Sequence, residues 1–152
     1  MKRRVADPAA APCPCGRGAG YGACCGRWHA GPTRLGAPDA ETLMRSRYAA
    51  YALGLHDYLL DTWHPSTRPS AVAPDAPGTV WLGLEVRAHR PDGPDRATVE
   101  FVARCRVAGR GLRLHETSRF VLERGRWWYV DGDLVEAGGS RTAAKPWVPP
   151  NP

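Results

Sequence analysis

The sequence predicts an α+β fold in which helices from the first half pack on one face of an antiparallel sheet from the second half. Beyond Pro38, the prolines, 15 in the whole chain, leave three long proline-free stretches, Asp39–His64, Gly78–Arg90 and Asp95–Lys145. Because proline lacks a backbone donor, regular elements should lie within these stretches. Apolar residues recur at helical spacing in the first stretch and alternate with polar residues in the other two. Helices followed by such strands are typical of an α+β domain.

The first proline-free stretch predicts two helices. Asp39 is a suitable N-cap and Gly54 a suitable C-cap for the first of them. One apolar stripe recurs at helical spacing along it: Met44, Tyr48, Tyr51, Ala52 and Leu55. A shorter helix is expected at about His56–Trp63 and should end before Pro65. Residues 65–77 are expected to form a proline-rich loop.

The later stretches predict four antiparallel strands: Val80–Ala88, Thr98–Val107, Leu112–Leu122 and Arg126–Leu134. Apolar and polar side chains alternate in each, so one sheet face should be apolar and the other polar or partly covered. In the first strand the apolar set is Val80, Leu82, Leu84, Val86 and Ala88. Cys105 falls on the apolar side of the second strand, where a buried, inert thiol is expected.

The composition indicates a folded protein outside the membrane. Apolar residues make up 43% of the chain and charged residues 24%, as in globular domains. No run approaches the roughly 18 apolar residues of a spanning helix. The basic start Met1-Lys2-Arg3-Arg4 is not followed by the apolar segment of an export signal. Since the 5 cysteines are an odd number, a disulfide framework is disfavoured, and we expect a cytoplasmic protein with reduced thiols.

Four N-terminal cysteines have the pattern C-x-C-x8-C-C: Cys13, Cys15, Cys24 and Cys25. Zinc prefers four soft ligands at tetrahedral corners, and two close pairs joined by a glycine-rich turn can supply them. The sequence therefore predicts one structural Zn²⁺, closed by protein ligands and without an open position for catalysis. His29 could replace one cysteine, although a surface or supporting role is the preferred interpretation. Redox-active or fortuitous thiols are the alternative to a metal site.

The run from Cys13 to Cys25 resembles the SEC-C motif, a zinc module found at the C-terminus of the SecA translocation ATPase and in other proteins. The segment Leu43–Tyr51, which has the sequence LMRSRYAAY, resembles the segment that identifies the bacterial YchJ-like family of uncharacterised proteins. Later stretches agree with that family: 57–64, 80–86, 99–101, 115–120 and 126–132. The resemblance covers residues 13–134.

The resemblance implies an NTF2-like (cystatin-like) cone over residues 38–135, in which helices cover a curved antiparallel sheet and enclose a pocket. A SEC-C zinc knuckle at residues 13–30 precedes the cone. Residues 1–12 and 136–152 are expected to be flexible tails, the second rich in proline and glycine. The resemblance implies no established activity, because NTF2-like cones include both enzymes and binding domains. SEC-C modules elsewhere contact proteins or ribosomes.

One acidic residue interrupts the apolar side of the third strand. Glu116 must there be paired, protonated or lining a cavity. Arg47 flanks the apolar stripe of the first helix and could pair with Glu116. The catalytic candidates are therefore Glu116, His64 and Arg47, because a carboxylate near a histidine can act as an acid and base. Further candidate lining residues are Trp63, Trp81 and Glu85. The plainer interpretation is a structural Glu–Arg pair that links helix to sheet.

These observations favour a binding protein over an enzyme: a cytoplasmic protein with structural zinc that binds a protein partner or a small ligand. The first alternative is a pocket enzyme, of hydrolase or isomerase type, that uses Glu116 with His64 or Arg47. The second is a weak nucleic-acid or ribosome binder, because basic residues together with aromatic ones can form a platform for a single strand. Its candidate surface lies near Trp128 and contains Arg104, Arg106, Arg110, Arg113, Arg119, Arg124 and Arg126. A homodimer formed through the sheet also fits a cone of this type.

Overall fold

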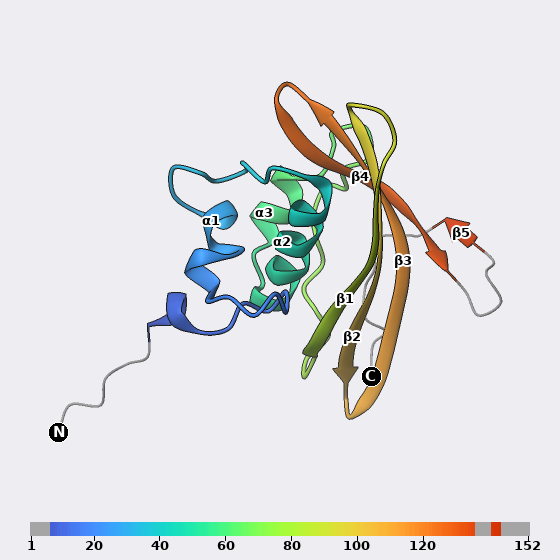
Figure 1. Ribbon diagram of the computed structural model, residues 1–152. Helices are drawn as coiled ribbons and strands as arrows, with labels where there is room; N and C mark the ends of the chain where they lie inside the picture. Colours follow the sequence, from blue (N-terminus) through green and yellow to red (C-terminus); the bar gives the residue numbers. More distant parts are fainter. Residues whose placement is uncertain (1–6, 136–140, 144–152) are drawn as a thin grey trace.

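The computed structural model describes residues 7–135 and 141–143, and it confirms the α+β fold. Figure 1 shows the helices grouped on one side of a curved sheet, with the N-terminal segment on the far side of the helices. The sheet contains five strands in the order β1-β2-β3-β4-β5, and all neighbours are antiparallel. Much of the predicted tails, residues 1–6, 136–140 and 144–152, lies outside the described residues.

Helical elements precede the strands, as predicted. They are two 3-10 turns and three helices: η1 (Pro8–Ala10), η2 (Tyr21–Ala23), α1 (Gly26–His29), α2 (Ala40–Leu53) and α3 (His56–Asp61). The four predicted strands are confirmed and run slightly longer than expected: β1 (Val80–Pro91), β2 (Arg96–Val107), β3 (Arg110–Glu123) and β4 (Arg126–Val135). A fifth short strand, β5 (Arg141–Ala143), pairs with β4 within the segment expected to be a tail.

Helix α2 begins and ends at the residues that the sequence predicts. The Asp39 side chain accepts a hydrogen bond of 2.7 Å from the backbone N–H of Thr42, which satisfies one of the free donors of the first turn. Gly54 ends the helix with a positive φ of 71°, a conformation that costs glycine little. The inward side of α2 places Leu43, Met44 and Tyr48 in the main core.

Helix α3 ends at Asp61, earlier than predicted, because the following residues pair with the sheet. The backbone N–H of Tyr129 donates to Thr62 O at 2.9 Å, and the N–H of His64 donates to Tyr129 O at 2.7 Å. The chain from Thr62 to His64 therefore lies beside β4, and Trp63 forms a parallel bridge with Tyr129. A short helical pattern in the sequence does not reveal this competing partner.

The predicted apolar face of β1 is correct only in its middle. Leu84 and Val86 pack on the core, but Val80 is 50% and Leu82 48% exposed. The register shifts between Trp81 and Gly83, so that Leu82 has no cross-strand partner and Trp81 faces the helices instead. An extra residue of this kind reverses which side chains face inward, because successive side chains point to opposite faces. A second shift, after Val86, pairs Ala88 with Glu100.

The N-terminal segment packs outside α2 and against the edge of the sheet. Its four cysteines form a separate buried cluster together with Ala49 of α2, and Leu84 of β1 packs against it. Nη1 of Arg45 donates to the carbonyl oxygen of Cys15 at 3.1 Å. At Gly16, an added Cβ would lie 3.7 Å from the carbonyl oxygen of Leu84. The cysteine-containing loop therefore lies directly against β1, the first strand of the sheet.

Candidate functional site

The four predicted cysteines lie together. The Sγ atoms of Cys13, Cys15, Cys24 and Cys25 are all within 4.8 Å of one another, and all four residues are buried. The first two come from the loop before η2, and the second two connect η2 to α1. None of them forms a disulfide. Four convergent sulfur atoms of this kind are the donor set that a tetrahedral Zn²⁺ site requires.

The close approach of the thiols gives them different pKa values. A hydrogen bond from the Cys25 thiol outweighs burial and lowers the pKa of Cys15 to about 4. Burial and the hydrogen bond with Cys15 raise the pKa of Cys24 to about 11. The pKa of Cys25 is also raised, first by its hydrogen bond with Cys15 and then by burial. The cluster thus favours a single thiolate. Ionisation of a second thiol requires a nearby positive charge.

His29 is not part of this cluster of ligand atoms. Its Nδ1 accepts a hydrogen bond from the Tyr21 hydroxyl at 2.6 Å, and its Nε2–H donates to the carbonyl oxygen of Ser46 at 2.8 Å. The carbonyl can only accept, which assigns the proton to Nε2. Burial lowers the pKa of His29 and favours this neutral form. The side chain is buried, so the supporting role is the better description, and it joins the cysteine segment to α2.

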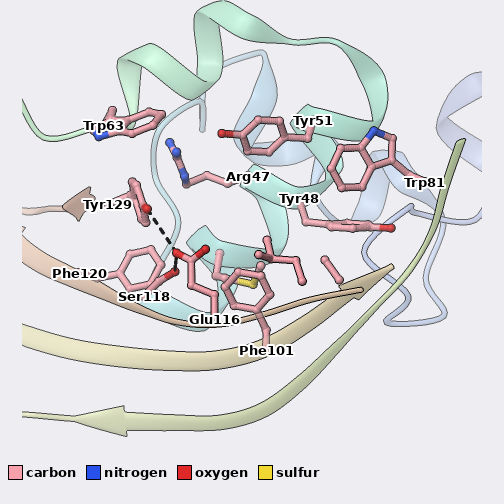
Figure 2. Close-up of a pocket in the computed structure, with 13 residues that line it drawn as sticks. Arg47, Tyr48, Tyr51, Trp63, Trp81, Phe101, Glu116, Ser118, Phe120 and Tyr129 are labelled. Carbon is pink, nitrogen blue, oxygen red and sulfur yellow. Dashed lines mark hydrogen bonds between the residues drawn. The ribbon is translucent and has the colours of Figure 1, made fainter. Parts of the chain in front are cut away.

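A second site lies between α2 and the sheet, where a cavity of about 60 Å³ opens (Figure 2). Aromatic side chains form most of its wall: Tyr48, Tyr51, Trp63, Trp81, Phe101, Phe120 and Tyr129. Met44, Ala103 and Leu114 add aliphatic surface, and Arg47, Glu116 and Ser118 add polar groups. The predicted pocket therefore exists, and its wall includes the predicted residues Arg47, Glu116, Trp63 and Trp81.

Glu116 is buried in this wall. Its Oε1 accepts hydrogen bonds from Ser118 Oγ at 2.8 Å and from the Tyr129 hydroxyl at 3.4 Å. Burial is the main cause that raises the pKa of Glu116, and the bonds from Ser118 and Tyr129 and the charge of Arg47 oppose it. At Gly132 on β4, an added Cβ would collide with the Glu116 carboxylate, so only glycine leaves room for this side chain.

Arg47 reaches the cavity from α2 without forming the predicted pair with Glu116. Its Nη1 donates to Leu59 O at 2.8 Å and to Thr62 Oγ1 at 2.7 Å. Its guanidinium lies over the rings of Trp63 and Tyr129, 4.9 and 4.3 Å from their centroids. Within the described residues, no carboxylate oxygen lies within 4.0 Å of Arg47. The structural Glu–Arg pair is therefore replaced by backbone and aromatic contacts.

His64 does not reach Glu116, and this corrects the predicted pairing. Its Nε2 lies 2.8 Å from Oε2 of Glu123, and its Nδ1 lies 2.6 Å from Ser66 Oγ. Trp63 and His64 are consecutive in an extended segment, so when Trp63 faces the cavity His64 faces the other way. Glu85 is also outside the cavity wall, on the exposed side of β1.

Sequence reasoning did not assign Tyr129 or Gly132 to the site. Tyr129 lies in the aromatic run Trp127-Trp128-Tyr129, in which successive side chains face opposite sides of the sheet. A register shift between Arg119 and Phe120 determines which of these side chains face the cavity, because it places Phe120 opposite Tyr129. The aromatic run was the available signal, but the shift depends on pairing between β3 and β4.

Two arginines of the predicted nucleic-acid surface form contacts within the molecule. Arg119 bonds to Asp131 at 2.5 Å and to Asp133 at 2.7 Å. Arg126 donates to the carbonyl oxygen of Asp61 and lies 3.7 Å from the Trp128 ring centroid. Both arginines therefore have intramolecular partners, which weakens the case for a continuous nucleic-acid surface. The predicted burial of Cys105 is confirmed.

Family models match most of the chain. The model described as the middle NTF2-like domain of YchJ matches residues 39–132, and the SEC-C motif model matches residues 11–27. The chain is 59% identical over 134 residues to a UPF0225 protein of Bordetella bronchiseptica, a match that covers 88% of this chain and 99% of that protein. It is 64% identical over 123 residues to a UPF0225 protein of Methylibium petroleiphilum, covering 81% of this chain and 88% of that protein.

Two solved structures are similar. The solution structure of a SEC-C motif containing protein from Rhodopseudomonas palustris matches with a TM-score of 0.70 and 38% identity, over 83% of this chain and 100% of that one. The crystal structure of a SEC-C motif containing protein from Psychrobacter arcticus matches with a TM-score of 0.69 and 29% identity, over 82% of both chains. Among the described residues, no helix has the length and apolar character needed to cross a membrane.

Proposed function

Because this chain belongs to the YchJ-like family of UPF0225 proteins and carries a SEC-C motif, we propose that it is a cytoplasmic binding protein organised by one structural Zn²⁺. The ligands would be Cys13, Cys15, Cys24 and Cys25. The observation that carries the proposal is the convergence of their four buried sulfur atoms within 4.8 Å. Four sulfur ligands leave no open coordination position, so the metal would stabilise the segment and take no part in catalysis.

Metal content tests the zinc site directly. The purified protein should contain one zinc atom per chain by elemental mass spectrometry. Cys15→Ser should lose that metal, since a hydroxyl is a much poorer zinc ligand than a thiolate. Cys105→Ser is the matched control, because Cys105 is equally buried but belongs to another cluster. Metal-free wild-type protein, or a Cys15→Ser variant that keeps its zinc, would contradict the proposal.

An exposed apolar surface beside the cysteine segment supports a role in protein interaction. The large hydrophobic side chains found exposed in the described part of the chain are Leu53, Val80 and Leu82. All three line one groove, whose wall also contains Cys13 and Pro14 of the cysteine segment. Clustered exposed apolar groups of this kind mark contact surfaces. A protein partner would therefore contact the cone and the zinc segment together.

Two matched variants on β1 test this surface. Leu82→Ser removes apolar area from the groove, whereas Arg87→Ser changes an exposed residue of the same strand outside it. Partners crosslinked to the wild-type protein in cells should be lost from Leu82→Ser and retained by Arg87→Ser. Equal recovery with both variants would place the contact surface elsewhere. Zinc content measured on the same samples separates this result from loss of the metal.

A further inference from the structure

Arg47 and Glu116 are both buried in the wall of the cavity between α2 and the sheet, but they do not form an ion pair. Arg47 and Glu116 are each only 5% exposed, and both contribute to the cavity wall. Arg47 has no acid within ion-pair distance in the described part of the chain. Burying a charge is costly unless hydrogen bonds and an opposite charge compensate it. The guanidinium has the hydrogen bonds and the aromatic faces, but no counter-ion in contact.

Both side chains also retain free hydrogen-bonding groups. Only Oε1 of Glu116 has partners among the described residues, and Figure 2 shows the other carboxyl oxygen turned toward the middle of the cavity. Arg47 donates through Nη1 alone, so in the same described part its Nε and Nη2 groups form no hydrogen bond. A ligand between the two residues could therefore bind to both without breaking an existing contact.

The charge of the cavity favours an anionic ligand. Arginine stays protonated in proteins, whereas burial raises the pKa of Glu116 and favours its neutral form. The groups that face Glu116 are Arg47 from α2, Ser118 on β3, and Tyr129 with the more distant Asp133 on β4. With Glu116 neutral, Arg47 gives the wall a net positive charge. A cationic ligand would have to lie beside that guanidinium.

The size and wall of the cavity restrict the ligand to a small one. Its volume is about 60 Å³, and a cavity needs at least about 10–15 Å³ to hold one water molecule. The space therefore suits a carboxylate group with one or two carbon atoms. Tyr51, Trp81 and Tyr129 are half-buried members of the wall, so the cavity is not sealed from solvent. Asp75 lies outside the wall, and its carboxylate accepts a hydrogen bond from Trp81 Nε1 at 2.9 Å, which fixes the indole ring.

We propose that this cavity binds a small monocarboxylate, with both carboxylate oxygens on the free Nε and Nη2 donors of Arg47, one of these oxygens also accepting a hydrogen bond from Glu116, and the carbon chain against the aromatic wall. Planar anions with two acceptor oxygens match the donor geometry of a guanidinium. The inference goes beyond the proposed function, whose protein contact surface lies in a different groove. The zinc site takes no part in it.

Three ligands of the same size and different charge test the proposal on the wild-type protein. Propionate, propionamide and propylammonium are titrated at pH 7 and constant ionic strength. The indole N–H signals of Trp63 and Trp81 are followed by NMR, with Trp28 near the cysteine segment as the internal control. Propionate should bind about tenfold or more tightly than propionamide, since a charge-assisted bond is worth about 1.5–3 kcal/mol. Stronger binding of propylammonium, equal binding of the amide, or no saturable binding would overturn the proposal.

Variants then assign the contacts. Arg47→Lys keeps the charge but loses the two-pronged donor and should weaken propionate binding about fivefold or more. Arg87→Lys, a surface change, should leave it unchanged. Glu116→Leu removes the carboxyl donor and should also weaken propionate binding. Zinc content and unfolding curves are recorded for each variant, so that misfolding or metal loss is distinguished from loss of the ligand site. Unchanged affinity in a folded Arg47→Lys protein would contradict the assigned contact.

Discussion

At the scale of single residues, Gly132 determines where the Glu116 carboxyl can lie. An added Cβ there would collide with Oε1 of Glu116 and approach Thr117 O to 3.0 Å. Gly132→Ala should therefore lower the free energy of unfolding by about 1–3 kcal/mol, the usual cost of overpacking a core. Urea denaturation measures this. Gly111→Ala on β3 is the control, since an added Cβ there meets nothing within 4 Å. Equal stability of the two variants would contradict the close packing.

Glu116 should also make the stability of the protein depend on pH. Burial raises its pKa above the ordinary value of 4.5, so the folded protein holds a proton that the unfolded chain releases just above 4.5. Stability from this residue is full below that pH and falls as the pH rises through the raised pKa. Glu116→Gln removes the effect and leaves Arg47, Tyr129 and Asp133 in place.

The corresponding measurement compares urea unfolding of the wild-type protein and Glu116→Gln at about pH 5 and pH 8. The free energy of unfolding of Glu116→Gln minus that of the wild type should increase between the two. Taking this difference cancels other titrating groups, including the cysteines. A difference that stays constant would show that Glu116 titrates as an ordinary exposed carboxyl, and one that falls would show that folding lowers its pKa; either result would contradict the prediction.

His29 shows how one side chain can connect two segments. It bonds to Tyr21 and to the carbonyl oxygen of Ser46 in α2. His29→Ala should cost about 1–3 kcal/mol, because it leaves a buried acceptor without its donor. Hydrogen exchange should increase at the amides of residues 24–29 and stay slow in β2 and β3. Tyr21→Phe, which removes only the hydroxyl, should have a smaller effect. Uniformly faster exchange across the sheet would contradict a local role.

At the scale of elements, the sequence predicts well whatever depends on neighbouring residues. The caps of α2, the order of helices and strands and the cysteine pattern are all local signals, and the structure confirms Asp39, Gly54 and the clustering of the four cysteines. Strands β2 and β3 also carry the predicted alternation, with Val99, Phe101 and Leu114 in the core. Local chemistry thus defines most of the fold and one of the two candidate sites.

What the sequence does not predict depends on pairing between distant segments. The bulge at Leu82 reverses the inward phase of β1, and the pairing of Thr62 with Tyr129 ends α3 early and turns His64 outward. The sequence identifies Glu116 by its place on an apolar face and Arg47 by its place beside an apolar stripe. Their contacts, and the part played by Tyr129, follow from register and from packing across the cavity.

At the scale of the whole molecule, the cysteine segment and the cone have separate cores. The cysteine cluster meets the cone through Ala49 and Leu84, whereas the main core lies between α2 and the sheet and receives Trp28 from the N-terminal segment. Removal of the proposed zinc by a chelator should therefore unfold residues 13–30 while β1 to β4 remain folded. Hydrogen exchange before and after chelation measures this. Cooperative loss of the whole sheet would instead mean that the metal supports the entire fold.

The position of Gly16 next to the carbonyl oxygen of Leu84, where an added Cβ would lie 3.7 Å from that oxygen, has a consequence for solubility. Strand β1 is at the margin of the sheet, where unpaired backbone groups can recruit a strand from another molecule. The cysteine loop shields part of that margin, next to the aliphatic side chains of Val80 and Leu82. Without the proposed zinc, the cysteine loop would leave the edge of β1 exposed. Addition of a strand from another molecule would then compete with the native state. The metal would then act as a guard against aggregation.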